Sequence, residues 1–209
     1  MSDLLPLFPL HNVVLFPNVF LPLHIFEPRY REMVADAVAS DRMIGMVLLR
    51  PGWEHDYEGR PPIYPTGCSG LITHVERLSD GRYNIVLRGL ERFRVVEEDR
   101  ARSYRRASIE PWAERRLDDA DRLLIRNQRA RLEAMLAAPN DPKAEPRIPP
   151  AMSDEDLINA LAQYLDLEAL EKQALLERPC LRSRAESLVE LLEMKVLMAR
   201  TPGLSNVAH

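Results

Sequence analysis

The chain has 209 residues, of which 46% are hydrophobic and 29% are charged, and its formal net charge is −4. A chain of this length buries about 70% of its unfolded surface, which allows one large domain or two small ones. The negative net charge gives the chain as a whole no electrostatic reason to bind nucleic acid, and no run of about 18 apolar residues predicts a membrane span.

The first half of the chain, up to about residue 112, is predicted to be mostly β-structure. Its apolar runs are short, rich in Val, Ile and Phe, and separated by Pro and Gly, a pattern typical of strands joined by turns. Asp80-Gly81 predicts a tight hairpin because both residues can take positive φ. The expected extended segments, which together indicate a closed or nearly closed barrel, are Leu4–Leu10, Val13–Phe16, Val19–Phe26, Met43–Leu49, Cys68–Leu78, Arg82–Leu87, Phe93–Glu97 and Tyr104–Trp112.

One helix is predicted among these strands. It begins at Pro28, because proline suits the first helical turn, where its missing N–H would be unpaired anyway. Apolar residues follow at a spacing of three or four, so the helix is expected to run to about Ser40. The stretch Arg50–Thr66 carries four prolines and is predicted to be a long loop.

Beyond residue 112 the pattern becomes helical, with Leu, Ala, Arg and Glu dominant. Helices are predicted over Leu117–Ala138, from the cap Ser153 to Leu165, over Leu167–Leu176 and over Arg182–Ala199. Strands followed by helices indicate an α+β fold and not an alternating α/β fold. The predicted organisation is a β-barrel subdomain over residues 1–116, a helical bundle over 117–200 with a Pro-rich linker at 139–150, and a flexible tail at 201–209.

The residues needed for common catalytic and metal sites are missing from the sequence. There is no Gly-x4-Gly-Lys phosphate loop, and the only lysines are Lys143, Lys172 and Lys195, which argues against ATP hydrolysis and a Ser–Lys peptidase. No two of the five histidines have metal-ligand spacing. We therefore predict no enzyme activity, no metal and no cofactor.

The two cysteines bear on the cellular compartment. Cys68 and Cys180 lie far apart and form no CxxC pair, which suits a reducing compartment and favours the cytoplasm. Cys68 is expected to be a small core residue. The N-terminal residues do not form a signal peptide, because Asp3 replaces the positive region and prolines interrupt the apolar one.

Several segments resemble the N-terminal substrate-recognition domain of Lon proteases, and most closely its stand-alone bacterial version. The resemblance covers nearly the whole chain and is most specific at its start. It rests on Leu5-Pro6-Leu7-Phe8-Pro9-Leu10, Val13-Val14-Leu15-Phe16-Pro17, Leu21-Pro22-Leu23-His24-Ile25-Phe26-Glu27-Pro28-Arg29-Tyr30, Asp41-Arg42, Ile44-Gly45, Gly67-Cys68 with Gly70, Asp80-Gly81-Arg82-Tyr83, Leu87-Arg88-Gly89-Leu90-Glu91-Arg92-Phe93, and Glu171-Lys172-Gln173 with Leu175-Leu176.

The resemblance implies a PUA-like β pseudo-barrel followed by an α-helical bundle. It also implies a non-enzymatic protein- or peptide-binding module, an adaptor in protein quality control, without the ATPase and protease parts of Lon. From the residues themselves, the Pro-rich opening motif is interpreted as mainly architectural, because each proline fixes φ and lowers the entropy lost on folding.

Candidate protein contacts lie in the Arg50–Thr66 loop, where Trp53, Tyr57 and Tyr64 could act as aromatic anchors. The alternative for Trp53 and Tyr64 is that they fold back onto the barrel. A second functional hypothesis is an RNA-binding PUA-like module, since residues 88–131 hold 13 arginines against 9 acidic residues. The pairs Asp118–Arg122 and Arg129–Glu133, at i,i+4 spacing, favour a solvated helix face instead.

The last helix is apolar on nearly every side from Leu188 to Met198. One amphipathic stripe spans little more than 100° and uses only about half of these residues. Met194 and Met198, one turn apart, suit an adaptable contact. We expect this helix either to wedge between barrel and bundle or to form a self-association seam.

Overall fold

The computed structural model describes residues 4–136 and 152–200, apart from the side chains of the last two. By their internal contacts the residues divide into two compact units. The sheet unit comprises Met1–Ala113 and Asn159–Glu177, and the helical unit comprises Glu114–Ile158 and Arg178–His209. The predicted linker at 139–150 and tail at 201–209 lie outside the described residues.

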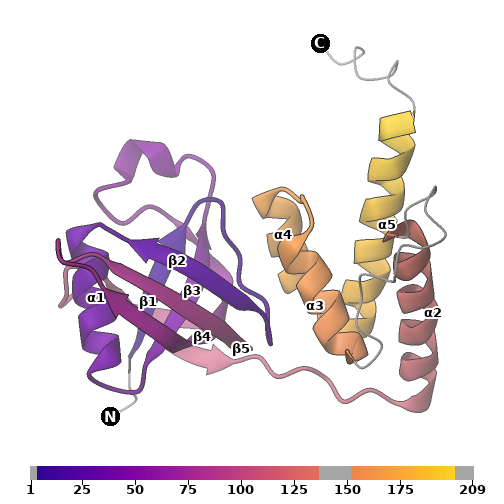
Figure 1. Cartoon of the computed structure of the whole chain (residues 1–209), viewed down its shortest axis with the longest axis horizontal. Helices are drawn as coiled ribbons and strands as arrows, with labels where there is room; N and C mark the ends of the chain where they lie inside the picture. The colour runs from indigo at the N-terminus through magenta and orange to yellow at the C-terminus, as the bar shows by residue number, and fades with distance from the viewer. Residues whose placement is uncertain (1–3, 137–151, 201–209) are drawn as a thin grey trace. The chain divides into compact units, whose positions relative to one another are not determined.

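Six strands form one mixed sheet whose order is β2-β5-β4-β3-β1-β6 (Figure 1). β6 also pairs with β5, so the pairings run in a ring from β5 through β4, β3, β1 and β6, with β2 outside it on β5. β1 and β3 are parallel and every other pair is antiparallel. This confirms the predicted α+β class with a pseudo-barrel. The strands are β1 Leu5–Leu10, β2 Phe20–Ile25, β3 Met43–Leu49, β4 Ile63–Arg77, β5 Tyr83–Asp99 and β6 Arg105–Pro111.

Some predicted strands differ from those observed. Arg82–Leu87 and Phe93–Glu97 belong to one long strand, β5, which stays continuous because bulges absorb its changes of register. Val13–Phe16 forms no strand, although its residues from Val14 onward are buried. The predicted loop after β3 is shorter than Arg50–Thr66, because β4 already begins at Ile63, and it contains a short 3-10 helix, η1, at Trp53–Asp56.

Two apolar clusters fill the strand region. The larger one joins the buried face of α1 to side chains of β1 to β5, and it contains Cys68 as expected. The smaller one joins β1, β3, β5 and β6 around the fully buried Phe93. A methyl group on Gly45 or on Gly67 would come within 2.8 or 2.7 Å of Phe93 Cζ. The two glycines therefore make room for this ring.

Helix α1, Pro28–Val38, begins at the predicted proline and lies along the strands (Figure 1). Tyr30, Met33, Val34 and Ala37 form its buried face, as their spacing predicts. The hairpin turn after β4 has Gly81 at φ +84°, in agreement with the predicted Asp80-Gly81 turn.

Two short helices contribute residues to the sheet unit, α3 at Asp154–Tyr164 and α4 at Ala169–Leu176. Ser153 caps α3, since its hydroxyl accepts the backbone N–H of Asp156 at 3.0 Å. The sequence-based limits place all of these residues in the helical bundle. By contacts, Asn159–Glu177 group with the strands instead.

The helical unit contains α2, Asp119–Leu136, and α5, Leu181–Arg200. Asp121 on α2 is buried and its carboxylate meets Arg115 at 2.5 Å and Arg182 at 3.4 Å. Of the two predicted helix-face pairs, Arg129–Glu133 is present at 2.8 Å. The predicted Asp118–Arg122 pair is not formed among the described residues; Asp118 Oδ1 accepts the backbone N–H of Asp121 at 2.8 Å and caps α2. A search of the described helices finds none with the length and apolar character of a membrane span.

Candidate functional site

The sheet unit contains a pocket of about 200 Å³ lined by four arginines and one carboxylate. Its walls come from α1, the loop between β3 and β4, the ends of β1 and β3, and the segment that enters β6. The charged residues of its lining are Arg29, Glu58, Arg60, Arg102 and Arg105.

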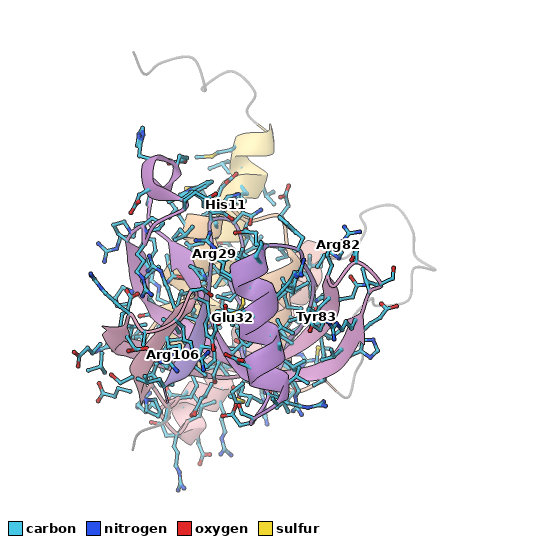
Figure 2. The ribbon with its side chains drawn as sticks, turned by 90° about the vertical axis from the view of Figure 1, so that its left-hand side faces the viewer. His11, Arg29, Glu32, Arg82, Tyr83 and Arg106 are labelled. Atoms are coloured by element: carbon cyan, nitrogen blue, oxygen red, sulfur yellow. The ribbon has the colours of Figure 1, made fainter. Side chains whose placement is uncertain are left out.

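The first turn of α1 supplies two neighbouring residues to this pocket. Tyr30 belongs to the buried face, and its ring packs on Phe8 with the ring centroids 4.5 Å apart. Arg29 precedes it on the rim and is labelled on α1 in Figure 2. Its guanidinium contacts Glu27 at 3.1 Å and donates two hydrogen bonds of 3.2 Å to the carbonyl of Tyr57. The helix start therefore fixes both a phenol and a guanidinium.

The loop around η1 forms one side of the pocket. The Tyr57 hydroxyl donates to Glu27 Oε1, and the Tyr57 ring lies 5.0 Å from the Arg29 guanidinium carbon. Trp53 packs edge-on against Tyr57 at 5.4 Å and stacks on His11 at 4.5 Å. The aromatic residues of the loop are thus held against α1 and the segment after β1.

Arg60 and Arg105 are positioned mainly by backbone carbonyls. Arg60 donates to the carbonyls of Asp99 and Arg102 at 3.0 and 3.2 Å. Arg105, whose side chain is only 6% exposed, donates to the carbonyl of Pro61 at 2.5 Å and to Glu98 at 3.4 Å. Because a guanidinium carries five N–H donors, each of these arginines retains donors beyond those bonds.

The segment before β6 is tied to the exposed side of α1. Arg102 lies 3.6 Å from Glu32 and 3.7 Å from Asp36, and the Ser103 hydroxyl donates to Glu32 at 2.7 Å. The Tyr104 hydroxyl donates to Asp36 at 2.7 Å. These contacts position the segment that carries Arg105 against the helix that carries Arg29.

Burial perturbs the titration of the pocket's phenols. It raises the pKa of Tyr104 to about 12, assisted by the hydrogen bond to Asp36. Burial also raises the pKa of Tyr30; the positive charges of Arg29 and Arg105 oppose that shift, and the negative charge of Glu27 adds to it. Within the part of the chain that the structure describes, the Tyr30 hydroxyl makes no hydrogen bond to protein and is open to solvent in the pocket, since it is not one of the buried side-chain atoms that lack a partner.

The residues predicted from sequence as protein contacts lie in three places. Trp53 and Tyr57 pack together, both partly buried, and Tyr57 lines the pocket. Tyr64 lies on β4 with the Arg50 guanidinium 5.3 Å from its ring centre, and it does not line the pocket. Met194 and Met198 lie on α5, in the helical unit, and are 48% and 65% exposed.

Sequence reasoning missed the pocket arginines and Tyr30. Arg29 and Tyr30 stand inside the motif that carries the family resemblance, but that motif was interpreted as architectural. The local signal was a charged pair, Glu27 and Arg29, at the start of a predicted helix. The residue that follows, Tyr30, occupies an apolar position of that helix but carries a polar hydroxyl. Arg60 and Arg105 carried no local signal, because only the fold brings them near α1.

Part of the arginine-rich stretch that suggested RNA binding is engaged in ion pairs. Arg105 pairs with Glu98, Arg106 with Asp99 at 2.5 Å, and Arg115 with the buried Asp121. Paired guanidiniums release fewer counterions from a phosphate backbone. The structure therefore gives the RNA hypothesis no support beyond composition.

The fold and sequence are similar to those of known proteins. Lon protease 2 of Myxococcus xanthus is 30% identical over 92% of this chain, and the Lon protease of Anaeromyxobacter dehalogenans is 29% identical over 91%. The chain spans only 24% and 23% of these relatives.

Solved structures agree. A Lon N-terminal domain protein from Xanthomonas campestris matches with a TM-score of 0.60 at 25% identity, covering 90% of this chain and 98% of that one. The N-terminal domain of a Mycobacterium avium complex Lon protease matches in fold with a TM-score of 0.66 at 18% identity, covering 91% and 98%. Residues 4–194 match the family described as the ATP-dependent protease La (LON) substrate-binding domain. The chain belongs to the LON substrate-binding domain family.

Proposed function

We propose that this chain is a non-enzymatic module that binds segments of other proteins, and that it serves as an adaptor in protein quality control in the cytoplasm. The observation that carries the proposal is the match of residues 4–194 to a family described by its substrate-binding role in an ATP-dependent protease. Because the substrates of a protease are protein chains, a domain that binds them must recognise peptide groups and side chains.

The chemistry of the pocket supports binding more than catalysis. Its volume of about 200 Å³ is below the range of about 300–1,000 Å³ typical of sites for drug-sized ligands. A general base works best with a pKa near the operating pH, whereas the pKa of Tyr104 is about 12 and that of Tyr30 is also raised. Arginine and tyrosine are enriched at protein interfaces, and both line this pocket.

The contacts proposed from sequence extend this surface. Trp53 and Tyr57 lie beside the pocket and would flank a bound segment, while Tyr64 would offer a further aromatic contact. Met194 and Met198 would serve a different partner face on α5, including a second copy of this chain. These roles are part of the proposal.

The test is binding of an unfolded protein without turnover. Reduced, carbamidomethylated α-lactalbumin is titrated into the purified chain and compared with the native, disulfide-bonded form. We expect the unfolded form alone to bind, and neither ATP hydrolysis nor cleavage of the ligand to exceed a buffer control. Equal binding of both forms, no binding, or measurable turnover would each contradict the proposal.

A further inference from the structure

We infer that the open edge of β2 binds an extended segment of another protein chain as an added strand, held by backbone hydrogen bonds. The inference rests on the proposed function, because it assumes that unfolded chains are what the module meets. It adds how such a chain is held and which residues hold it.

The open edge is a property of the sheet's topology. Among the strands that the structure describes, only β2 has a single neighbour, since each of the other five is paired on both sides. Closing a barrel removes strand edges, and an edge that remains is a template for a further strand. β2 has six residues, the usual length of a strand. A whole segment can therefore pair along it.

The pairing of β2 with β5 fixes which backbone groups point to the open edge. The backbone N–H of Gly89 donates to the carbonyl of Val19 at 2.8 Å, so the backbone of Val19 faces β5. In an antiparallel pair the residues of one strand face the partner alternately. The backbone groups of Phe20, Pro22 and His24 therefore point away from β5.

Two observations agree with this orientation. The Tyr164 hydroxyl on α3 donates to the carbonyl of Phe20 at 2.8 Å, which requires that carbonyl to face away from β5. Proline is tolerated in an edge strand where its missing N–H would face solvent, and Pro22 has that position. The groups that remain are the N–H of Phe20, the carbonyl of Pro22 and both backbone groups of His24, and none of them is hydrogen-bonded to another described residue. An extended chain presents donors and acceptors at the matching spacing.

The side chains along the open edge suit an apolar segment. The chain has five phenylalanines, of which three are buried, whereas Phe20 and Phe26, at the two ends of β2, are 50% and 60% exposed. Leu21 and Leu23 point to the other face and are only partly buried against the core. Aromatic and β-branched side chains on neighbouring strands stabilise each other. The segment should therefore carry β-branched or aromatic residues at alternating positions.

Pro22 also distinguishes a foreign segment from a second copy of this chain. If two β2 strands paired antiparallel across their open edges, Pro22 would lie opposite Pro22 of the other copy, and neither would supply an N–H to the other's carbonyl. A foreign segment without proline supplies that N–H. Proline on an edge strand is a common protection against pairing of identical edges, so we assign the edge to a foreign chain.

The experiment titrates the full chain with the peptide acetyl-Lys-Val-Thr-Val-Thr-Val-Glu-amide, whose β-branched residues favour an extended conformation. Amide hydrogen exchange is followed by NMR. At saturation, exchange at the amides of Phe20 and His24 should slow at least tenfold, because both become hydrogen-bonded to the peptide. The amides of Leu21 and Leu23, which face β5, should change little and serve as internal controls.

Two N-methylated analogues of the peptide test for backbone pairing. An extended strand carries its N–H groups alternately on its two edges, so only one set can face β2. One analogue is methylated at its three valines and the other at its two threonines, and the side chains stay the same. One analogue should bind as the parent does, and the other at least tenfold more weakly.

A variant of the chain tests the assignment to β2. Pro22→Val supplies the missing N–H at the open edge and should strengthen binding of the peptide about fivefold, the effect of one neutral hydrogen bond. The matched control is Pro65→Val, because Pro65 is also exposed and lies in β4, a strand with neighbours on both sides. It should leave binding unchanged.

Several outcomes would overturn the inference. These are no binding of the parent peptide, binding that leaves exchange at Phe20 and His24 unchanged, equal binding of the two N-methylated analogues, and no gain from Pro22→Val. Slow exchange at both amides before peptide is added, together with a doubled mass in light scattering, would show that a second copy covers the edge. The unfolded α-lactalbumin titration separates this failure from that of the proposed function. If the unfolded protein binds without slowing exchange at these amides, the module binds chains by other contacts. If the peptide pairs with β2 while the unfolded protein does not bind, the strand site stands and the protein-binding role falls.

Discussion

The packing of Phe93 against two glycines allows a sharp test of the barrel interior. The three heavy atoms nearest to a methyl group placed on Gly45 all belong to side chains, with Leu5 Cδ2 at 2.7 Å, Phe93 Cζ at 2.8 Å and Leu7 Cδ2 at 2.9 Å. A methyl group on Gly67 would meet Phe93 Cζ at 2.7 Å and also the backbone carbonyl oxygen of Met46 at 2.4 Å. The two substitutions therefore differ in whether a smaller neighbour can relieve them.

The expected magnitudes follow from overpacking and cavity energetics. Gly45→Ala and Gly67→Ala should each destabilise the sheet unit by about 1–3 kcal/mol, with Gly67→Ala at the upper end. Phe93→Leu should itself destabilise by about 1–2 kcal/mol, less than the 3–5 kcal/mol typical of Phe→Ala. In the double variant with Gly45→Ala, the shorter side chain makes room for the methyl group. This double variant should therefore be about 1–2 kcal/mol more stable than the sum of its two single losses predicts. In the double variant of Gly67→Ala with Phe93→Leu, the two losses should nearly add.

Urea unfolding followed by tryptophan fluorescence measures these free energies. Trp53 and Trp112 both belong to the sheet unit, so the signal reports on that unit. Gly52→Ala is the control, because Gly52 has φ +88° and no atom within 4 Å of a built Cβ. Because alanine is strained at positive φ, this variant shows a loss of about 1–2 kcal/mol that comes from the backbone without overpacking; Gly45 and Gly67 have no positive φ and do not share it. If Phe93→Leu restored as much stability to Gly67→Ala as it restores to Gly45→Ala, the reasoning would be refuted.

Three further predictions concern other parts of the chain. Asp121→Asn should destabilise the helical unit by about 1–2 kcal/mol, because it removes the buried carboxylate that pairs with two partly exposed arginines, Arg115 and Arg182. Thermal unfolding followed by circular dichroism measures this loss. The control is Asp119→Asn, at an exposed position, which should change stability far less. Since the pKa of Tyr104 is raised to about 12 from about 10 in the unfolded chain, the unfolded state loses its proton first. Stability should fall as pH rises between these values, and Tyr104→Phe should reduce that slope in urea titrations. Replacing Met194 and Met198 together by Glu should leave the melting temperature nearly unchanged because both side chains are about half exposed or more; a large loss of stability would support the wedge, and a lower mass in light scattering would support the self-association seam.

Local chemistry made part of the fold predictable. Pro28 suits a first helical turn, and helix α1 begins there. Asp80-Gly81 could take the backbone angles of a tight turn, and Gly81 has positive φ. Met43–Leu49 is a run of apolar residues long enough for one buried strand, and β3 has those bounds. Each of these signals depends on residues that are neighbours in sequence.

The candidate site could not be predicted in the same way. Arg29, Arg60 and Arg105 converge only because α1, the loop before β4 and the start of β6 meet in the fold. An arginine is usually solvent-exposed, so burial of Arg105 to 6% contradicts what composition alone suggests. Asp121 shows the same limit, since aspartate is usually exposed, whereas this one, in the first turn of α2, is 2% exposed.

The grouping of Asn159–Glu177 with the strands has a physical cause that periodicity cannot reveal. Val13–Phe16 lacks a strand partner, so the backbone N–H of Phe16 needs another acceptor, and Gln163 Oε1 accepts it at 3.1 Å. The carbonyl of Thr66 likewise accepts the side-chain N–H of Gln173 at 3.0 Å. Both glutamines are less than a tenth exposed, and leaving either backbone group buried without a partner would cost about 1–3 kcal/mol. Two residues that look like solvent-facing positions of amphipathic helices thus complete the hydrogen bonding of the sheet unit, which is why the helical segment that carries them belongs to it.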